Sequence, residues 1–266
     1  MTDAADATPD LRLETEGPLA WIVADNPGRM NAYTADMWAK MPRHVAAADA
    51  DPAVRVIIVR GAGTRAFSAG ADISEFENAR TGAAALEYDR LNHETFSALL
   101  GAAKPVIAMV HGFCLGGGLG IAACADLRLA DQHAQFSIPA AKLGLGYNAR
   151  WIRPLLALAP PAFVKEMLFT GRRLSGEEAL RAGIVNTLVD VDTLEIAVRS
   201  LAADIAANAP LTVRAAKLSI DELVRHPEEP DFEKLDAAVA TCFESADYAE
   251  GRRAFLEKRK PAFQGK

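Results

Sequence analysis

Two apolar segments of strand length each lead directly into a glycine-rich loop. The first, at 54–60, precedes a loop that ends in FSAGAD, and the second, at 105–111, precedes the loop at 112–120. Helix-like stretches follow both loops, at 82–100 and at 121–125. Strands that alternate with helices favour an α/β fold in which buried strands run in the same direction. This alternation constrains the fold more than any other feature of the sequence.

Helical patterns dominate the last third of the chain. Ser175 and Glu178 have the spacing of a capping box, which predicts that a helix begins there. Gly183 is a residue at which that helix can end. The later helices carry little apolar sequence for a core of their own. We therefore divide the chain into a core over 1–200 and a helical segment over 201–266, which packs on the core or on a second subunit. The expected helices of this region span 194–207, 211–224, 232–243 and 248–259.

Composition excludes several classes of protein. The chain has 29 Lys and Arg against 35 Asp and Glu, a net charge of −6, which argues against nucleic acid as the main partner because phosphates are bound by cations. Three scattered cysteines and the absence of Cys/His ligand spacing predict neither disulfides nor a metal. No apolar run approaches the about 20 residues of a membrane helix, and the acidic N-terminus does not resemble a secretory signal. We expect a cytoplasmic protein without a membrane partner.

The two glycine-rich loops are candidate sites for negative charge. Small residues let a ligand approach the backbone, and a loop that leads into a helix presents unpaired N–H groups. Either loop alone is equally compatible with a structural role, but two loops supply the two donors that an oxyanion hole needs. A dinucleotide site is disfavoured: 118–123 match G-x-G-x-x-A, yet 136–150 contain no acidic residue for the ribose.

Five segments, in order, resemble the enoyl-CoA hydratase/isomerase (crotonase) superfamily. They are FSAGADISEF, KPVIAMVHGFCLGGGLGIAACADLRLA, QFSIPAAKLGLG, FTGRRLSGEEALRAGIVNTLV and FLEKRK. The resemblance implies an α/β, crotonase-like spiral of ββα units with a C-terminal helical trimerisation segment, assembled as a homotrimer or a dimer of trimers. It also implies a lyase or isomerase of fatty acid metabolism that acts on an acyl-CoA, with no separate cofactor because coenzyme A is part of the substrate.

The resemblance also implies roles for individual residues. By position, Ala71 and Gly117 donate their backbone N–H groups to the thioester carbonyl and stabilise an enolate. Lys258 has an alternative role, since a cation at a helix C-terminus is favoured by the helix dipole alone. The residues implied to bind the CoA moiety are Arg29, Ala69, Asp72 and Ile73, together with Phe255 and Lys258 near the adenine and phosphates, which reach the site from another region of the trimer.

The sequence departs from the superfamily at the positions of two glutamates that hydratases use. Gly120 and Ala140 stand there, and neither can act as a general acid or base, a role typically worth about 10²–10⁴-fold in rate. Orthodox hydration is therefore not expected, and double-bond isomerisation, decarboxylation or a relaxed hydratase-like addition stays open. Tyr147 and Asn148 are candidate replacements, although Tyr147 could be a packing aromatic. The alternative function is a catalytically weak or silent CoA-ester-binding protein.

Overall fold

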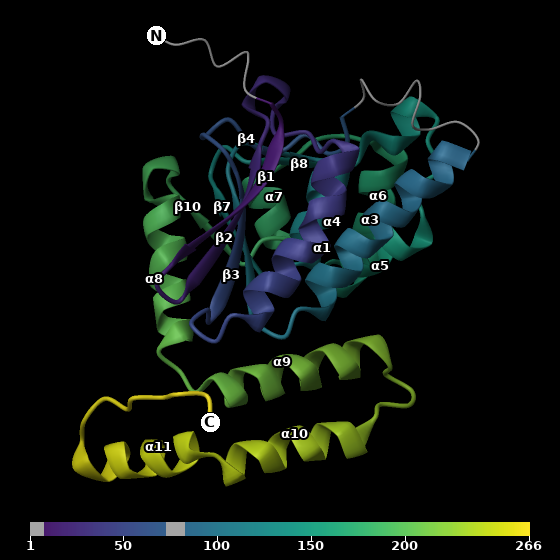
Figure 1. Cartoon of the computed structure of the whole chain (residues 1–266). Coiled ribbons are helices and arrows are strands. Elements are labelled where there is room, and N and C mark those ends of the chain that lie inside the picture. The colour runs from purple at the N-terminus through teal and green to yellow at the C-terminus, as the bar shows by residue number, and fades with distance from the viewer. Residues whose placement is uncertain (1–7, 73–82) are drawn as a thin grey trace.

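The larger of two β-sheets organises the core of the molecule. The computed structural model describes residues 8–72 and 83–266, and within them this sheet has the strand order β1-β2-β3-β5-β7-β10. Only the pairing of β1 with β2 is antiparallel, so the carboxyl ends of the other strands share the upper edge in Figure 1. The strands are Asp10–Glu16, Leu19–Asp25, Val56–Gly61, Val106–Val110, Leu127–Asp131 and Thr187–Val189.

A smaller sheet completes the repeating unit of the core. Strands β4, β6 and β8 follow β3, β5 and β7 along the chain and pair in parallel, and β9 joins β8 in antiparallel fashion. Successive pairs of strands therefore place one strand in each sheet. This arrangement confirms the expected α/β spiral of strand–strand–helix units. The four strands are Ala66–Ser68, Phe113–Leu115, Gln135–Ser137 and Leu174–Ser175.

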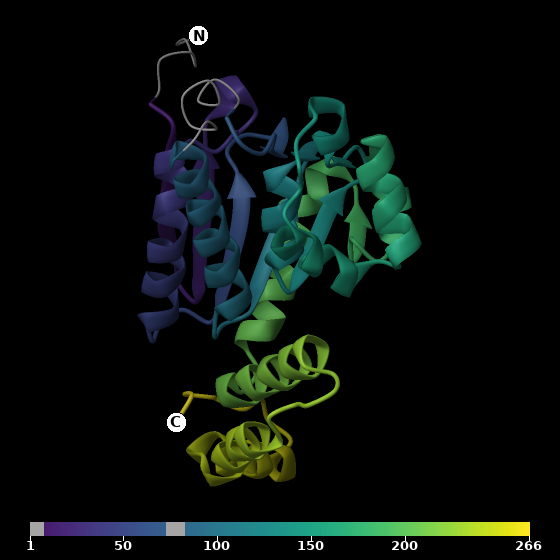
Figure 2. The same cartoon turned by 90° about the vertical axis from the view of Figure 1, so that its right-hand side faces the viewer.

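Helices cover both faces of the larger sheet. Alternate residues of one strand face opposite sides, so Ile57 packs with the main core while Val56 packs against helix α8, Leu194–Ala206. A strand buried on both faces needs a continuous apolar run, which explains the pattern at 54–60. The α-helices on the main-core side include α1 (Ala35–Ala50), α3 (Ala83–Gly101), α4 (Gly117–Cys124), α5 (Ala149–Leu158), α6 (Pro161–Thr170) and α7 (Gly176–Arg181) (Figure 2). Two 3₁₀ helices, η1 (Pro27–Arg29) and η3 (Pro139–Leu143), lie on the same side. A third 3₁₀ helix, η4 (Val191–Thr193), precedes α8.

The local signals for helix ends are confirmed. Ser175 and Glu178 form the expected capping box, with backbone-to-side-chain hydrogen bonds of 2.8 and 3.2 Å. Gly183 follows α7 with φ +84°, a conformation that favours glycine. No helix in the described ranges is long and apolar enough to cross a bilayer.

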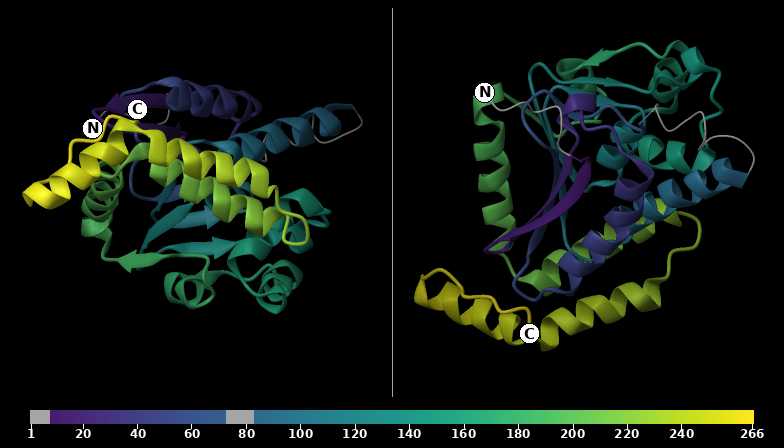
Figure 3. Two further views of the ribbon diagram at one scale, coloured as in Figure 1. Left: turned by 90° about the horizontal axis from the view of Figure 1, so that it is seen from below. Right: turned by 45° about the horizontal axis from the view of Figure 1, so that its top comes forward.

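The last three helices, α9 (Pro210–Arg225), α10 (Phe232–Glu244) and α11 (Ala246–Glu257), lie below the core in Figures 1 and 2. Helices α9 and α10 run side by side in Figure 3. An ion pair of 2.6 Å between Lys217 Nζ and Asp126 Oδ2 joins α9 to the core.

The C-terminal tail folds back along α11. The buried Asp247 carboxylate accepts hydrogen bonds from the amides of Gln264 at 2.6 Å and Gly265 at 2.7 Å. Its own amide donates to the Lys266 carbonyl at 3.2 Å. Arg55, next to β3, donates to the Gln264 carbonyl at 3.3 Å, so the tail connects α11 to the core.

Candidate functional site

The two glycine-rich loops pack against each other beside the smaller sheet. A methyl group on Gly70 would stand 2.8 Å from the amide nitrogen of Gly117, and one on Gly117 would stand 3.7 Å from the Gly70 Cα. Gly70 also has φ +93°, which an L side chain rarely adopts. The loops approach this closely because Gly70 has no side chain.

The backbone N–H groups of Ala71 and Gly117 donate no hydrogen bond to any other described residue. The amides around them are used: Asp72 N donates to Tyr33 O at 2.9 Å, and Gly116 N donates to Ser137 O at 2.7 Å. Gly117 is the first residue of α4, where a backbone N–H has no acceptor inside the helix. Two such amides on adjoining loops can stabilise negative charge on an oxygen.

Three of the residues expected to bind CoA lie together at this edge. Ala69 N donates to Met30 O at 2.9 Å, which holds the loop against η1. Arg29, on η1, approaches the buried Asp72 carboxylate at 3.5 Å and keeps 58% of its side chain exposed. This exposed cation beside the loops could contact a phosphate. The fourth residue of this group, Ile73, lies outside the described residues.

The other two expected CoA-binding residues lie at the opposite end of the molecule, on and just after α11. Phe255 is on α11 with 83% of its surface exposed, and Lys258 follows at the exposed C-terminal cap of that helix. Figure 1 shows α11 below the core and η1 above it. One chain therefore does not bring these two residues to the other CoA-binding candidates.

An aromatic side chain occupies the space beside the first missing glutamate. A methyl group on Gly120 would stand 2.7 Å from Cζ of Phe96, a residue of α3 that is only 4% exposed. A longer side chain at position 120 requires Phe96 to move. Ala140 is also buried, at the beginning of η3. The described structure places no carboxylate at either position.

Phe96 belongs to a row of aromatic rings, here named the aromatic cluster, that reaches the glycine-rich loop at Gly117. The Trp38 ring lies 3.1 Å from the position of a methyl group on Gly117, and its indole N–H donates to the Tyr88 hydroxyl at 2.8 Å. No local sequence pattern indicates this cluster, because its members are scattered along the chain and resemble ordinary core residues. The members are Tyr33, Trp38, Tyr88, Phe96, Tyr147 and Trp151, with neighbouring ring centroids 4.8–6.4 Å apart.

Tyr147 and Asn148 have different surroundings although they are adjacent in sequence. The Asn148 side chain accepts a hydrogen bond from Arg150 N at 3.0 Å and caps α5. The Tyr147 hydroxyl is buried and has no partner among the described residues. Burial raises the pKa of Tyr147, so the phenol stays protonated. The cap therefore occupies the side-chain oxygen of Asn148, whereas the Tyr147 hydroxyl is left for a ligand.

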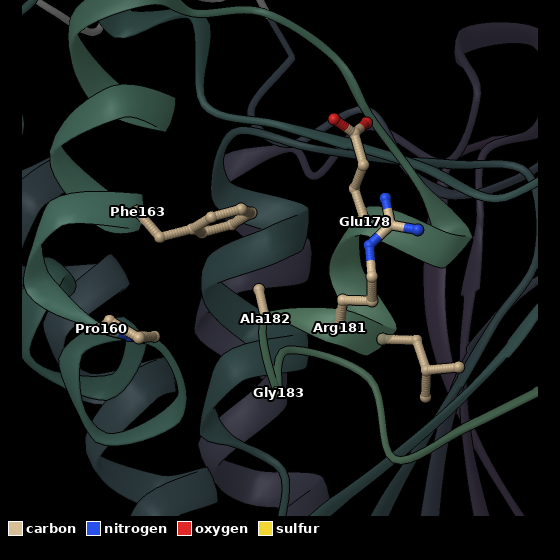
Figure 4. A pocket seen from close by; sticks show the side chains of 7 residues that line it. Pro160, Phe163, Glu178, Arg181, Ala182 and Gly183 are labelled. Atoms are coloured by element: carbon tan, nitrogen blue, oxygen red, sulfur yellow. The ribbon is translucent and has the colours of Figure 1, made fainter.

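A separate pocket of about 510 Å³ lies near the N-terminus of α6 and the end of α7 (Figure 4). It contains none of the candidate site residues described above, although Glu178 of the capping box and Gly183 belong to its lining. Its lining comprises Pro160, Phe163, Glu178, Leu180, Arg181, Ala182 and Gly183. In the described part of the chain, no group of three or more His, Cys, Asp or Glu side chains could hold a metal ion.

Comparisons with known proteins agree with this architecture. Residues 14–266 match the family model described as enoyl-CoA hydratase/isomerase. The chain is 35% identical over 257 residues to a crotonyl-CoA hydratase of Syntrophomonas wolfei, with 97% of this chain and 98% of that protein covered. It is also 35% identical over 263 residues to a carnitinyl-CoA dehydratase of Salmonella arizonae, with 96% and 98% covered.

A solved structure shows the same similarity in three dimensions. The crystal structure from Hyphomonas neptunium, titled as an enoyl-CoA hydratase/isomerase family protein, superposes with a TM-score of 0.91 at 40% identity. The superposition covers 95% of this chain and 97% of that one. With the family model matched over nearly the whole length and the spiral fold present, the chain belongs to the enoyl-CoA hydratase/isomerase family.

Proposed function

We propose that this protein is an acyl-CoA enzyme that polarises the thioester carbonyl through the N–H groups of Ala71 and Gly117. Two amides left unpaired by the described fold, on loops in direct contact, carry this proposal. When the α-carbon loses a proton to water or another base, the electron pair of the broken C–H bond moves to the thioester oxygen as an enolate. Donors fixed before the reaction stabilise that charge without reorganisation. The relatives named above act on crotonyl-CoA and carnitinyl-CoA, which are also acyl thioesters of CoA.

The reaction that we propose does not use the paired glutamates of a hydratase. Gly120 and Ala140 cannot transfer a proton, and Phe96 fills the space next to Gly120. A lyase or isomerase step through the enolate, such as a double-bond shift or a decarboxylation, needs the oxyanion hole but not those two carboxylates. Tyr147 is the candidate to hold or deliver a proton, because its hydroxyl is protonated and unpartnered.

We further propose that CoA binding is completed between subunits. Arg29, Ala69, Asp72 and Ile73 would bind CoA from one copy, and Phe255 with Lys258 would do so from another. The helical segment 201–266 is suited to assembly as a homotrimer or a dimer of trimers, because burying its apolar side chains would stabilise contacts with neighbouring copies. Its strongly exposed residues include Ile220, Phe232, Phe243, Phe255 and Leu256.

Deuterium exchange tests the proposed chemistry directly. Butyryl-CoA is incubated with the protein in D₂O, and exchange of its α-hydrogens is followed by mass spectrometry. We expect exchange above the rate without protein, together with little loss of crotonyl-CoA absorbance. Tight butyryl-CoA binding without exchange would instead favour the silent CoA-ester-binding protein, the function suggested by the two missing carboxylates. Rapid crotonyl-CoA hydration would contradict the exclusion of hydratase activity.

A further inference from the structure

A cavity of about 310 Å³ lies at the lower edge of the larger sheet in Figure 1, where β3 and β5 begin. Its walls come from three parts of the chain: the core at the end of α1 and the starts of these strands, the junction of α8 with α9, and the C-terminal tail. A methyl group on Gly265 would stand 3.5 Å from Cγ of Pro210, so the tail packs on the first residue of α9. None of the described residues that we propose for acyl-CoA lines this cavity.

The charged groups in the wall of this cavity are mostly cationic. Arg55, Lys104 and Arg214 line it, and Asp49 is the only carboxylate among the described lining residues. Both oxygens of Asp49 are already used by the fold, because they accept hydrogen bonds from the amides of Ala103 at 2.8 Å and Lys104 at 3.1 Å. The cavity therefore has an excess of positive charge that its own carboxylate does not pair.

The fold satisfies the three cations to different degrees. Lys104 Nζ donates to two backbone carbonyls near the end of α1, at 2.5 and 2.7 Å. Burial lowers the pKa of Lys104, and the charge of Arg55 acts in the same direction, whereas two nearby carboxylates oppose it. The Arg55 guanidinium donates to a carbonyl of the tail at 3.3 Å. The Arg214 guanidinium has no hydrogen bond or ion pair with another described residue, so it is free to bind an anion.

The rest of the wall is apolar, which restricts the kind of anion that fits. Its apolar side chains include Pro52, Val54, Pro105, Ile205 and Leu211. Guanidinium groups bind carboxylate and phosphate oxygens through charge-assisted hydrogen bonds. The volume is at the lower end of the range of about 300–1,000 Å³ that is typical of small-molecule sites. A small organic anion matches both parts of the wall, because its apolar body would cover the apolar side chains.

We propose that this cavity binds a small organic oxoanion, a carboxylate or phosphate group on a compact apolar body, through Arg55 and Arg214. Lys104 adds positive charge beside them. Because the walls belong to the core, to α9 and to the tail, the bound anion joins these parts and holds the helical segment 201–266 on the core. The inference does not depend on the proposed acyl-CoA function, since the cavity lies at the other edge of the sheet.

Four probes separate the effect of charge from that of the apolar body in isothermal titration calorimetry. Benzoate and phenyl phosphate carry the two charged groups on the same ring, benzamide is the neutral analogue of benzoate, and inorganic phosphate has no apolar body. We expect benzoate or phenyl phosphate to bind at least about tenfold more tightly than benzamide and inorganic phosphate. The comparison of the two ring anions identifies the favoured charged group. If neither ring anion exceeds benzamide and inorganic phosphate, the proposal is wrong.

Variants and a matched control assign the binding to this cavity. Arg55→Gln and Arg214→Gln should each weaken the favoured ring anion by about 5- to 10-fold, because each removes a charge-assisted contact. Arg214→Lys keeps the charge and should lose less. Arg43→Gln is the control, since Arg43 is an exposed, unpaired arginine of α1 outside the cavity, and it should leave the affinity unchanged. Thermal melting of each variant shows that the fold is retained before affinities are compared.

Amide hydrogen exchange supplies a readout at the cavity itself. The bound ring anion should slow exchange at Gln264 and Gly265 and around the first turn of α9, while α7 on the far side of the core stays unchanged. Ring-anion binding that survives both glutamine variants, or that leaves the tail amides unaffected, would place the anion elsewhere and overturn the proposal. The proposed acyl-CoA chemistry would stand in either case, because α-hydrogen exchange on butyryl-CoA tests it separately.

Discussion

The acyl and CoA portions of the candidate site are built in different ways. The acyl portion is contained in one chain: Ala71, Gly117 and the aromatic cluster lie on elements that pack together in the core. The proposed CoA portion is divided, with Arg29 beside the loops and Phe255 with Lys258 at the C-terminal end of α11, at the far end of the molecule (Figure 1). We infer that stabilisation of the thioester oxygen depends on the fold of a single chain, whereas affinity for the nucleotide depends on assembly.

The largest expected effect comes from removing one backbone donor on the acyl side. Ala71→Pro lacks the N–H, and the described fold does not use that group. We expect α-hydrogen exchange on butyryl-CoA to fall by about 10²–10³-fold, whereas the matched variant Ala71→Ser, which keeps the N–H, should stay within a few-fold of the unmodified protein. Equal rates in a folded Ala71→Pro variant would show that this amide does not contact the reacting oxygen.

A second prediction concerns the packing of Phe96 against Gly120, the position of the first missing glutamate. Gly120→Glu should lower the free energy of unfolding by about 1–3 kcal/mol, because the new side chain collides with Phe96 in a filled core. It should not gain hydration of crotonyl-CoA. The double variant Gly120→Glu with Phe96→Ala should be destabilised by less than the sum of the two single changes. Urea unfolding measures these values, and simple additivity would contradict the steric explanation.

A third prediction tests the divided CoA portion. Lys258→Ala should raise KM for an acyl-CoA by about 5- to 10-fold through the loss of one charge-assisted contact, with kcat little changed. The same acyl group on pantetheine, which lacks the nucleotide, should show no difference between variant and parent. Lys260→Ala is a control on the same exposed segment. An equal effect on both thioesters would place the role of Lys258 outside nucleotide binding.

The smallest expected effect is a change in the pH dependence of folding stability, caused by the buried His111. Burial lowers the pKa of His111, at the end of β5, so the folded protein resists its protonation while the unfolded chain binds the proton near the ordinary value of about 6.5. Stability is therefore present above that pH and is lost as the pH falls through it. His111→Gln should reduce this acid-induced loss, and His133→Gln, an exposed control, should not. Unfolding at pH 7.5 and 5.5 provides the measurement.

Sequence patterns predicted the parts of this molecule that depend on local chemistry. The capping box at Ser175 and Glu178 is confirmed because its interactions span a few residues. The α/β alternation with parallel strands is confirmed because buried strands require continuous apolar runs. The two glycine-rich loops, identified from the sequence as two possible donors, lie in contact at Gly70 and Gly117. Their roles toward a thioester stay a prediction.

The remaining features depend on contacts between distant segments. Nothing in the sequence around Phe96 indicates that its ring stands against Gly120, 24 positions later. Asn148 is a candidate from the sequence for bonding a carboxylate or water, and in the fold its side-chain oxygen also caps the helix that begins directly after it. The unpartnered state of Tyr147 likewise follows from neighbours that only the folded chain brings together.

The attachment of the C-terminal tail has a practical consequence for handling this protein. Asp247 accepts hydrogen bonds from the amides of Gln264 and Gly265, and Arg55 donates one to the same tail. The final residues therefore connect α11 to the core. An affinity tag is therefore better fused at the N-terminus. Trimming a few residues from the other end would remove these contacts and loosen α11, the helix that carries the proposed CoA-binding residue Phe255.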